Sequence, residues 1–268
     1  MSDFWGFGGY KREAEGYMSW QHLLFVSVLM VVMITSAIIL GLKYKNKDDK
    51  SKNKILIWAA ILIDGFELIK IVLLCFRSHD PLNWIYNLPL FLCSIQLITI
   101  PLAAFSKGRI KEAALDFVFI FGMLGAVLGT YLAGNNYASY PVLSFDNVVS
   151  GITHCISGFS ALYIGIAKMT SMKPKNIFIT FAILLGFCIL ALVADYTIPY
   201  NYMFLIRGDG TPYDIVYNLV NGNKILYPMI VILLFIIYVS IFYLIFFLIK
   251  KHKEKKALQK SKNQVAQN

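Results

Sequence analysis

Charged residues are scarce in this sequence. Only 15% of the 268 residues are Asp, Glu, Lys or Arg, whereas a soluble domain of this length carries about a quarter. The remaining charges gather in short stretches between long apolar runs, and 58% of the residues are apolar or aromatic. A run of roughly 20 apolar residues spans the hydrocarbon core of a bilayer. The composition therefore excludes an ordinary soluble domain and predicts an integral membrane protein.

Other patterns are lacking too. The apolar runs do not alternate with polar residues, as barrel strands would, so the spans should be helices that satisfy their own backbone hydrogen bonds. No internal repeat of the kind found in many transporters is visible. The net charge of +10 comes without any RNA- or DNA-binding pattern, and we expect no nucleic-acid partner.

Cysteine is also rare. The four cysteines are Cys75, Cys93, Cys155 and Cys188, and none forms a C-x-x-C pair. Zinc and thioredoxin-type sites therefore have no support. We expect no disulfide framework, no metal and no organic cofactor.

Seven apolar runs are long enough to cross a bilayer, which predicts an all-α bundle of seven transmembrane helices. The predicted spans are Trp20–Leu42, Ile55–Phe76, Tyr86–Phe105, Ala113–Leu132, Val148–Met169, Ile177–Pro199 and Ile225–Ile249. Residues 1–19 then form an N-terminal segment, residues 20–250 the membrane domain, and residues 251–268 a basic tail.

Lysine and arginine residues predict the orientation. The connections after spans one, three and five, together with the tail, hold nineteen of the twenty-five basic residues. Basic residues mark the cytoplasmic side, so we expect the N-terminus outside and the C-terminus inside. Lysine outnumbers arginine by 21 to 4, and Ile and Asn are abundant, which suggests an AT-rich genome. We expect a multi-pass protein of a bacterial cytoplasmic membrane. We expect a monomer.

Ionisable residues inside a span usually face the bundle interior and have a specific role. Span two contains Asp64, Glu67 and Lys70. Their spacing of three residues places them along one helix face. The group is either a buried structural pair or a functional one.

A cysteine and a histidine are predicted at the same depth. Cys93 lies seven residues into span three and His154 six residues into span five, so each sits roughly 10 Å below the outer end of the hydrocarbon. Glu67 is a little deeper. If these residues meet, the histidine can take the thiol proton and leave a thiolate nucleophile for an ester carbonyl. Gln96, which shares a helix face with Cys93 in this prediction, or Ser94 would stabilise the oxyanion, and Asp64 or Glu67 would orient the imidazole.

Three short segments carry a resemblance to a known family. They are Leu88-Pro89-Leu90-Phe91-Leu92-Cys93-Ser94, Gly151-Ile152-Thr153-His154 and Asn201-Tyr202-Met203-Phe204-Leu205. Together with the seven-span layout over residues 20–250, they resemble the YwaF-like bacterial membrane proteins, a family that includes the vertebrate transmembrane protein 164, an acyltransferase for ether phospholipids.

The resemblance implies a cysteine nucleophile at Cys93 and a histidine partner at His154. It also places Asn201 among the supporting residues, and it implies membrane phospholipids as substrates. The sequence departs from the family at Asn87 and Phe91, where other members often have histidine.

Two other functions remain open. A small-solute transporter or binding component would use Asp64, Glu67 and Lys70 as a polar relay, with no nucleophile. A non-enzymatic accessory subunit would need its polar residues only for packing. Acyl transfer requires that the Cys93 sulfur and a His154 nitrogen lie close together and near lipid.

Overall fold

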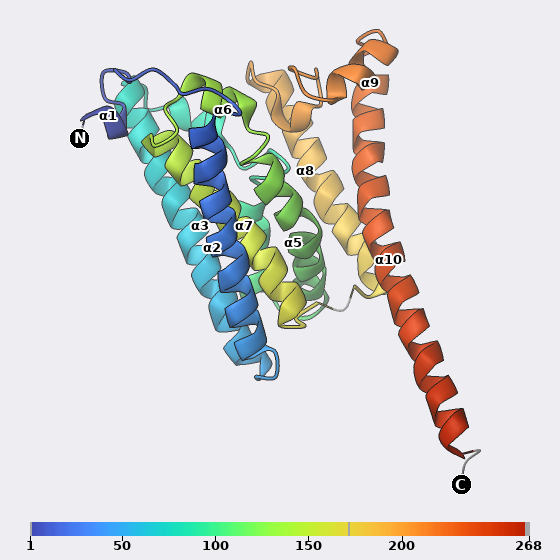
Figure 1. Cartoon of the computed structure of the whole chain (residues 1–268). Coiled ribbons are helices and arrows are strands. Elements are labelled where there is room, and N and C mark those ends of the chain that lie inside the picture. The colour runs from blue at the N-terminus through green and yellow to red at the C-terminus, as the bar shows by residue number, and fades with distance from the viewer. Residues whose placement is uncertain (1, 171, 266–268) are drawn as a thin grey trace.

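The computed structural model describes residues 2–170 and 172–265, and every regular element in these ranges is helical. The longer helices run along roughly one direction (Figure 1). In chain order the elements are α1 (Ser2–Trp5), α2 (Trp20–Tyr44), α3 (Asp49–Ser78), η1 (Asn83–Asn87), α4 (Gln96–Phe105), α5 (Gly108–Leu128), α6 (Gly134–Ser139), α7 (Phe145–Ile166), η2 (Pro174–Asn176), α8 (Ile177–Thr197), η3 (Tyr202–Phe204), α9 (Tyr213–Leu219) and α10 (Leu226–Val265).

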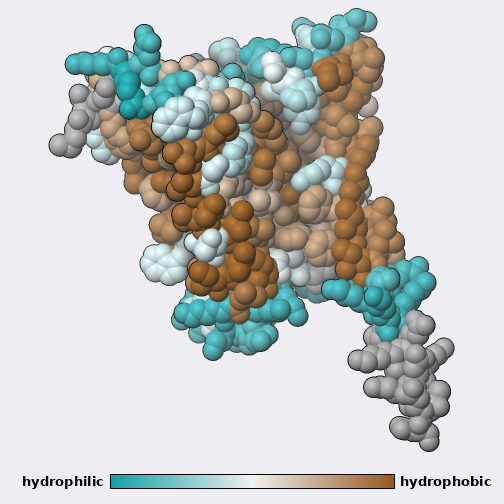
Figure 2. All heavy atoms as spheres, viewed as in Figure 1, coloured by the Kyte–Doolittle hydropathy of each residue, from teal (hydrophilic) through white to brown (hydrophobic). Residues whose placement is uncertain are grey.

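Four of the described helices are long and apolar enough to cross a membrane: α2, α7, α8 with the short η2 turn before it, and α10 as far as Lys256. Helices α3 and α5, with 30 and 21 residues, are comparable in length to α7, with 22, but carry more charged residues. Apolar side chains cover the middle of the visible face, and hydrophilic ones gather at its two ends (Figure 2). The molecule therefore has the surface of an integral membrane protein.

The predicted third span, Tyr86–Phe105, is wrong as a continuous helix. The chain forms the short η1 turn, then a non-helical stretch from Leu88 to Ile95, and only then the ten-residue helix α4. Cys93 lies in the non-helical stretch, so it does not share a helix face with Gln96. Pro89 lacks a backbone N–H and disfavours helical backbone in the residue before it, which explains part of the break.

Polar residues set the beginnings of three long helices. Ser19, Asp48 and Ser144 precede α2, α3 and α7, and each side chain accepts a hydrogen bond from the backbone N–H three residues later. Such N-caps satisfy backbone donors that have no partner within the helix. Helix α10 continues past the predicted end of its span at Ile249 and includes the basic segment as far as Val265.

Small residues let α5 and α7 pack closely, and these two helices form the most extensive helix pair of the molecule. A methyl group at Gly122 of α5 would meet the Ser157 carbonyl of α7 at 2.7 Å, and one at Gly158 would overlap Met33 of α2. Small residues at helix interfaces allow backbones to approach in membrane proteins. This packing places α7 against α5. Helix α3 lies beside α7 and α4, and α4 lies beside α5.

Helices α1, α6 and α9 lie at one end of the molecule, which we call the N-terminal end, and the C-terminus lies beyond the opposite end (Figure 1). At the N-terminal end, Arg77 in the last turn of α3 binds Asp146 at the start of α7, with Nη1–Oδ2 at 2.7 Å and Nη2–Oδ1 at 3.1 Å. The Tyr10 hydroxyl also donates to Asp146. The N-terminal segment is therefore attached to both helices.

Candidate functional site

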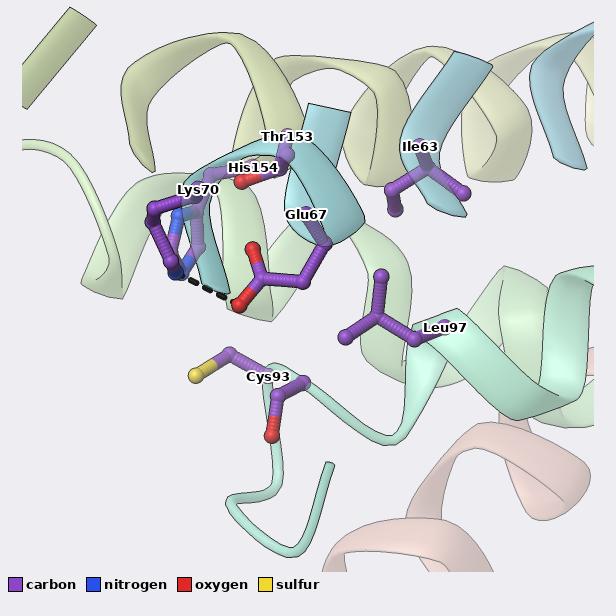
Figure 3. Close-up of a pocket in the computed structure, with 8 residues that line it drawn as sticks. Ile63, Glu67, Lys70, Cys93, Leu97, Thr153 and His154 are labelled. Atoms are coloured by element: carbon purple, nitrogen blue, oxygen red, sulfur yellow. Dashed lines mark ion pairs between the residues drawn. The ribbon is translucent and has the colours of Figure 1, made fainter. Parts of the chain in front are cut away.

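A small cavity lies between α3, α7 and the segment that leads into α4. It measures about 60 Å³. Its lining includes Cys93, His154, Glu67 and Lys70 (Figure 3). The remaining lining residues are Ile63, Ser94, Leu97 and Thr153. Residues from three distant parts of the chain thus meet around one space that would hold a reacting ester group but not a whole lipid.

Cys93 is held by a turn. The Ser94 hydroxyl accepts from the Phe91 N–H at 3.0 Å and bonds the Phe91 carbonyl at 3.1 Å. The Ile95 N–H donates to the same carbonyl at 2.9 Å. Cys93 lies within the loop that these bonds close, so its thiol is presented by fixed backbone just before α4. The Ser94 hydroxyl is already engaged in this turn.

His154 reaches the cavity from α7. Its Nδ1 lies 2.7 Å from the Ser150 carbonyl oxygen, one turn earlier in the helix. A carbonyl oxygen only accepts, so Nδ1 carries the proton and Nε2 presents a lone pair. His154 and Cys93 line the same small cavity, so the Nε2 lone pair is available to take the thiol proton.

Two glycines of α5 make room for this pair. A methyl group at Gly129 would overlap the His154 imidazole, and one at Gly125 would lie 3.4 Å from Cys93 Cα and Cβ. Gly125 and Gly129 are four residues apart and therefore lie on one face of the helix end. Sequence reasoning missed both residues, although their spacing was a signal that this face approaches another part of the protein closely.

Glu67 and Lys70 form an ion pair at the cavity. The distance from Lys70 Nζ to Glu67 Oε1 is 2.5 Å, and the two side chains are only 18% and 12% exposed, respectively. Asp64, one turn earlier on α3, is partly buried and is not among the lining residues. The group that orients the His154 imidazole is the Ser150 carbonyl, a backbone atom that no side-chain motif points to.

Gln96 and Asn201 lie outside the cavity lining. Gln96 is fully buried, and its Oε1 accepts from the Thr99 hydroxyl at 3.1 Å. Asn201 donates from Nδ2 to the Arg207 carbonyl and to an Asp209 carboxylate oxygen, each at 2.8 Å. Asn201 therefore fastens the loop after α8 rather than reaching the cavity.

That loop packs against the cysteine segment. The Phe91 ring lies 5.2 Å from the Tyr202 ring and 5.8 Å from the Phe204 ring, measured between centroids. The Tyr202 hydroxyl donates to the Ile85 carbonyl. Two of the three segments singled out in the sequence are thus in direct contact, and the third provides His154.

No cluster of three or more His, Cys, Asp or Glu side chains able to hold a metal ion occurs within the described ranges.

Comparison with known proteins identifies a family. Neither the curated proteins nor the solved structures include a match to the chain. The family model described as the TMEM164 family matches residues 17–249, which is most of the chain and includes every residue of the cavity lining. The chain therefore belongs to the TMEM164 family.

Proposed function

We propose that this protein is a membrane-embedded acyltransferase that moves a fatty acyl chain between phospholipids, or from a phospholipid to another lipidic acceptor, through a thioester on Cys93. The observation that carries the proposal is that the Cys93 thiol and the His154 imidazole line one small cavity within the helical bundle. The fixed tautomer of His154 makes Nε2 the base.

In the first half-reaction, His154 Nε2 takes the thiol proton and the Cys93 thiolate attacks the ester carbonyl of the donor lipid. The tetrahedral intermediate collapses with cleavage of the ester C–O bond. The imidazolium returns the proton to the departing lysolipid oxygen, and the acyl group stays on sulfur.

In the second half-reaction, His154 takes a proton from the hydroxyl of the acceptor, whose oxygen attacks the thioester carbonyl. The C–S bond breaks, and the thiolate regains its proton from the imidazolium. The backbone N–H groups of Cys93 and Ser94, next to the thiol in the chain, are the donors suited to the oxyanion. Exclusion of water favours transfer over hydrolysis.

We place the protein in a bacterial cytoplasmic membrane as a monomer with seven crossings. The segment from η1 through α4 forms the third crossing, with α3 and α5 as the second and fourth. The distribution of lysine and arginine supports an external N-terminus and a cytoplasmic C-terminus. The cavity then lies toward the outer leaflet, because His154 is nine residues from Phe145, where α7 starts at the N-terminal end.

The test is intact-mass spectrometry of the purified protein after incubation with a phospholipid mixture. We expect a hydroxylamine-labile acyl adduct on wild type, none on Cys93→Ala, and strongly slowed formation on His154→Ala. Cys155→Ala is the matched control, since Cys155 is a buried cysteine next to His154 in sequence that does not line the cavity. An unmodified wild type, with lipid remodelling in cells unaffected by Cys93→Ala, would reject acyl transfer and favour solute transport through the Glu67–Lys70 pair.

A further inference from the structure

We propose that Lys70 is the phosphate-binding residue of this site and that it selects a phosphate-bearing glycerolipid as the acyl donor, with Glu67 as its positioning residue. The role of this lipid as the acyl donor rests on the proposed function. The binding site itself is argued from the ion pair, its place in the cavity and the lipid-facing surface beside it.

The ion pair leaves hydrogen-bonding capacity for a ligand. An ammonium group has three N–H donors, and the bond that the structure gives Lys70 is the one to Glu67 Oε1 at 2.5 Å. Both side chains line the cavity. Glu67 fixes the ammonium at the wall of the cavity and neutralises it while no ligand is present. A phosphate oxygen entering the cavity would meet a preplaced cation, which is the favoured partner of such an anion.

The position of Lys70 relative to the reacting groups fits a glycerophospholipid. Lys70, His154 and Cys93 line one cavity, so the charge of Lys70 belongs to the same site as the two reacting side chains. In a glycerophospholipid only the glycerol carbons separate the phosphate from the ester carbonyls. A small cavity that holds a cation and a nucleophile together therefore fits a substrate whose anion and ester lie close to each other.

The surface next to the ion pair favours a lipid over a free phosphate solute. On α3, Leu68 and Ile69 lie between Glu67 and Lys70 in sequence, and they are 63% and 55% exposed. In a membrane these side chains face acyl chains. The helix thus presents lipid-facing residues one position away from the residues that reach the cavity, and a lipid can place its head group inside while its chains stay outside.

The proposal is tested by equilibrium binding of lipids that cannot undergo acyl transfer. Purified protein in detergent is titrated with a dialkyl ether glycerophosphoglycerol, with the matching phosphate-free dialkylglycerol, and with water-soluble glycerol 3-phosphate, and complexes are counted by native mass spectrometry. Wild type is compared with Lys70→Gln, Glu67→Gln and the double variant Glu67→Gln with Lys70→Gln. The double variant keeps the site neutral, so that no carboxylate is left unpaired.

We expect wild type to bind the ether phospholipid about tenfold or more tightly than dialkylglycerol, as loss of one charge-assisted contact implies. The double variant should lose this preference and bind dialkylglycerol as wild type does. Glu67→Gln should keep the preference, because the ammonium remains. Glycerol 3-phosphate should bind far more weakly than the ether lipid.

Three results would overturn the inference. They are an unchanged phosphate preference in the double variant, an equal loss of both lipids together with a lower melting temperature, and binding of glycerol 3-phosphate without binding of the ether lipid. Because ether lipids have no acyl ester, these results do not depend on thioester formation. Even if Cys93 does not transfer acyl groups, the binding measurement still decides whether Lys70 binds the phosphate.

Discussion

The imidazole of His154 lies against Gly129, at a point where any larger residue would overlap it. His154 lies near the middle of α7, and Gly129 is the C-cap residue of α5. Because Gly129 has no side chain, it leaves the space that the imidazole of the proposed base occupies.

Gly129→Ala tests this relationship. The added methyl group must displace the imidazole from Nε2 contact with the thiol, and a misplacement of about 1 Å can cost on the order of 100-fold in rate. We expect Cys93 acylation to slow by about that factor. Gly186→Ala in α8 is the control, since a methyl group there meets nothing within 4 Å. Wild-type acylation kinetics in a folded Gly129→Ala protein would contradict the assigned geometry.

Ser150→Ala tests whether the backbone carbonyl or the side-chain hydroxyl of Ser150 orients His154. The Ser150 carbonyl is 2.7 Å from Nδ1, whereas the Ser150 hydroxyl is 3.5 Å away, a long contact. The substitution keeps the carbonyl, so we expect an acylation rate within about threefold of wild type, since a weak contact contributes well under 1 kcal/mol. A loss comparable to that of His154→Ala would show that the hydroxyl, not the carbonyl, fixes the tautomer. Acylation rates by intact mass are the measurement.

The Arg77–Asp146 pair is expected to stabilise the N-terminal end of the bundle. Its side chains are 13% and 10% exposed, so removal of one partner leaves a largely buried charge and should cost about 3–5 kcal/mol. We expect Arg77→Met and Asp146→Asn each to lower the melting temperature in detergent. The double variant should lose less than the sum of these two losses. Strictly additive losses in this double-mutant cycle would show that the two side chains do not interact.

Ionisation of Tyr10 should make the stability of the N-terminal end depend on pH. Burial, and then its hydrogen bond to Asp146, raise the pKa of the Tyr10 hydroxyl from 10 to about 12. Its contribution to stability is therefore complete below about pH 10, the unfolded value, and is lost as the pH rises toward 12. The difference in phenolate absorbance between wild type and Tyr10→Phe should titrate near the upper value, and ionisation of Tyr10 near pH 10 would contradict the contact.

The apolar helices were predictable from sequence because lipid imposes a minimum length on them. The predicted spans from Trp20, Val148, Ile177 and Ile225 correspond to α2, α7, α8 and α10. The third span was mispredicted because hydropathy does not register the turn that Phe91, Ser94 and Ile95 build with their own hydrogen bonds.

The candidate site was predictable in its residue types but not in its geometry. Equal depth suggested that Cys93 and His154 meet, and the two do share a cavity. Their contact depends on which helices are neighbours, which one sequence does not reveal. Gly129 and the Ser150 carbonyl have no chemical signature in sequence, because one contributes no side chain and the other only backbone.

The shortness of α4 has a consequence for how the protein is made. Ten residues of helix extend about 15 Å, half of a bilayer core of about 30 Å, and the backbone before them is irregular. Such a segment cannot partition into lipid by itself, because its unpaired amides would face hydrocarbon. We expect it to enter the membrane together with α3 and α5, the helices it contacts most. The stretch that carries the proposed nucleophile would then take its place only once both of these helices are present.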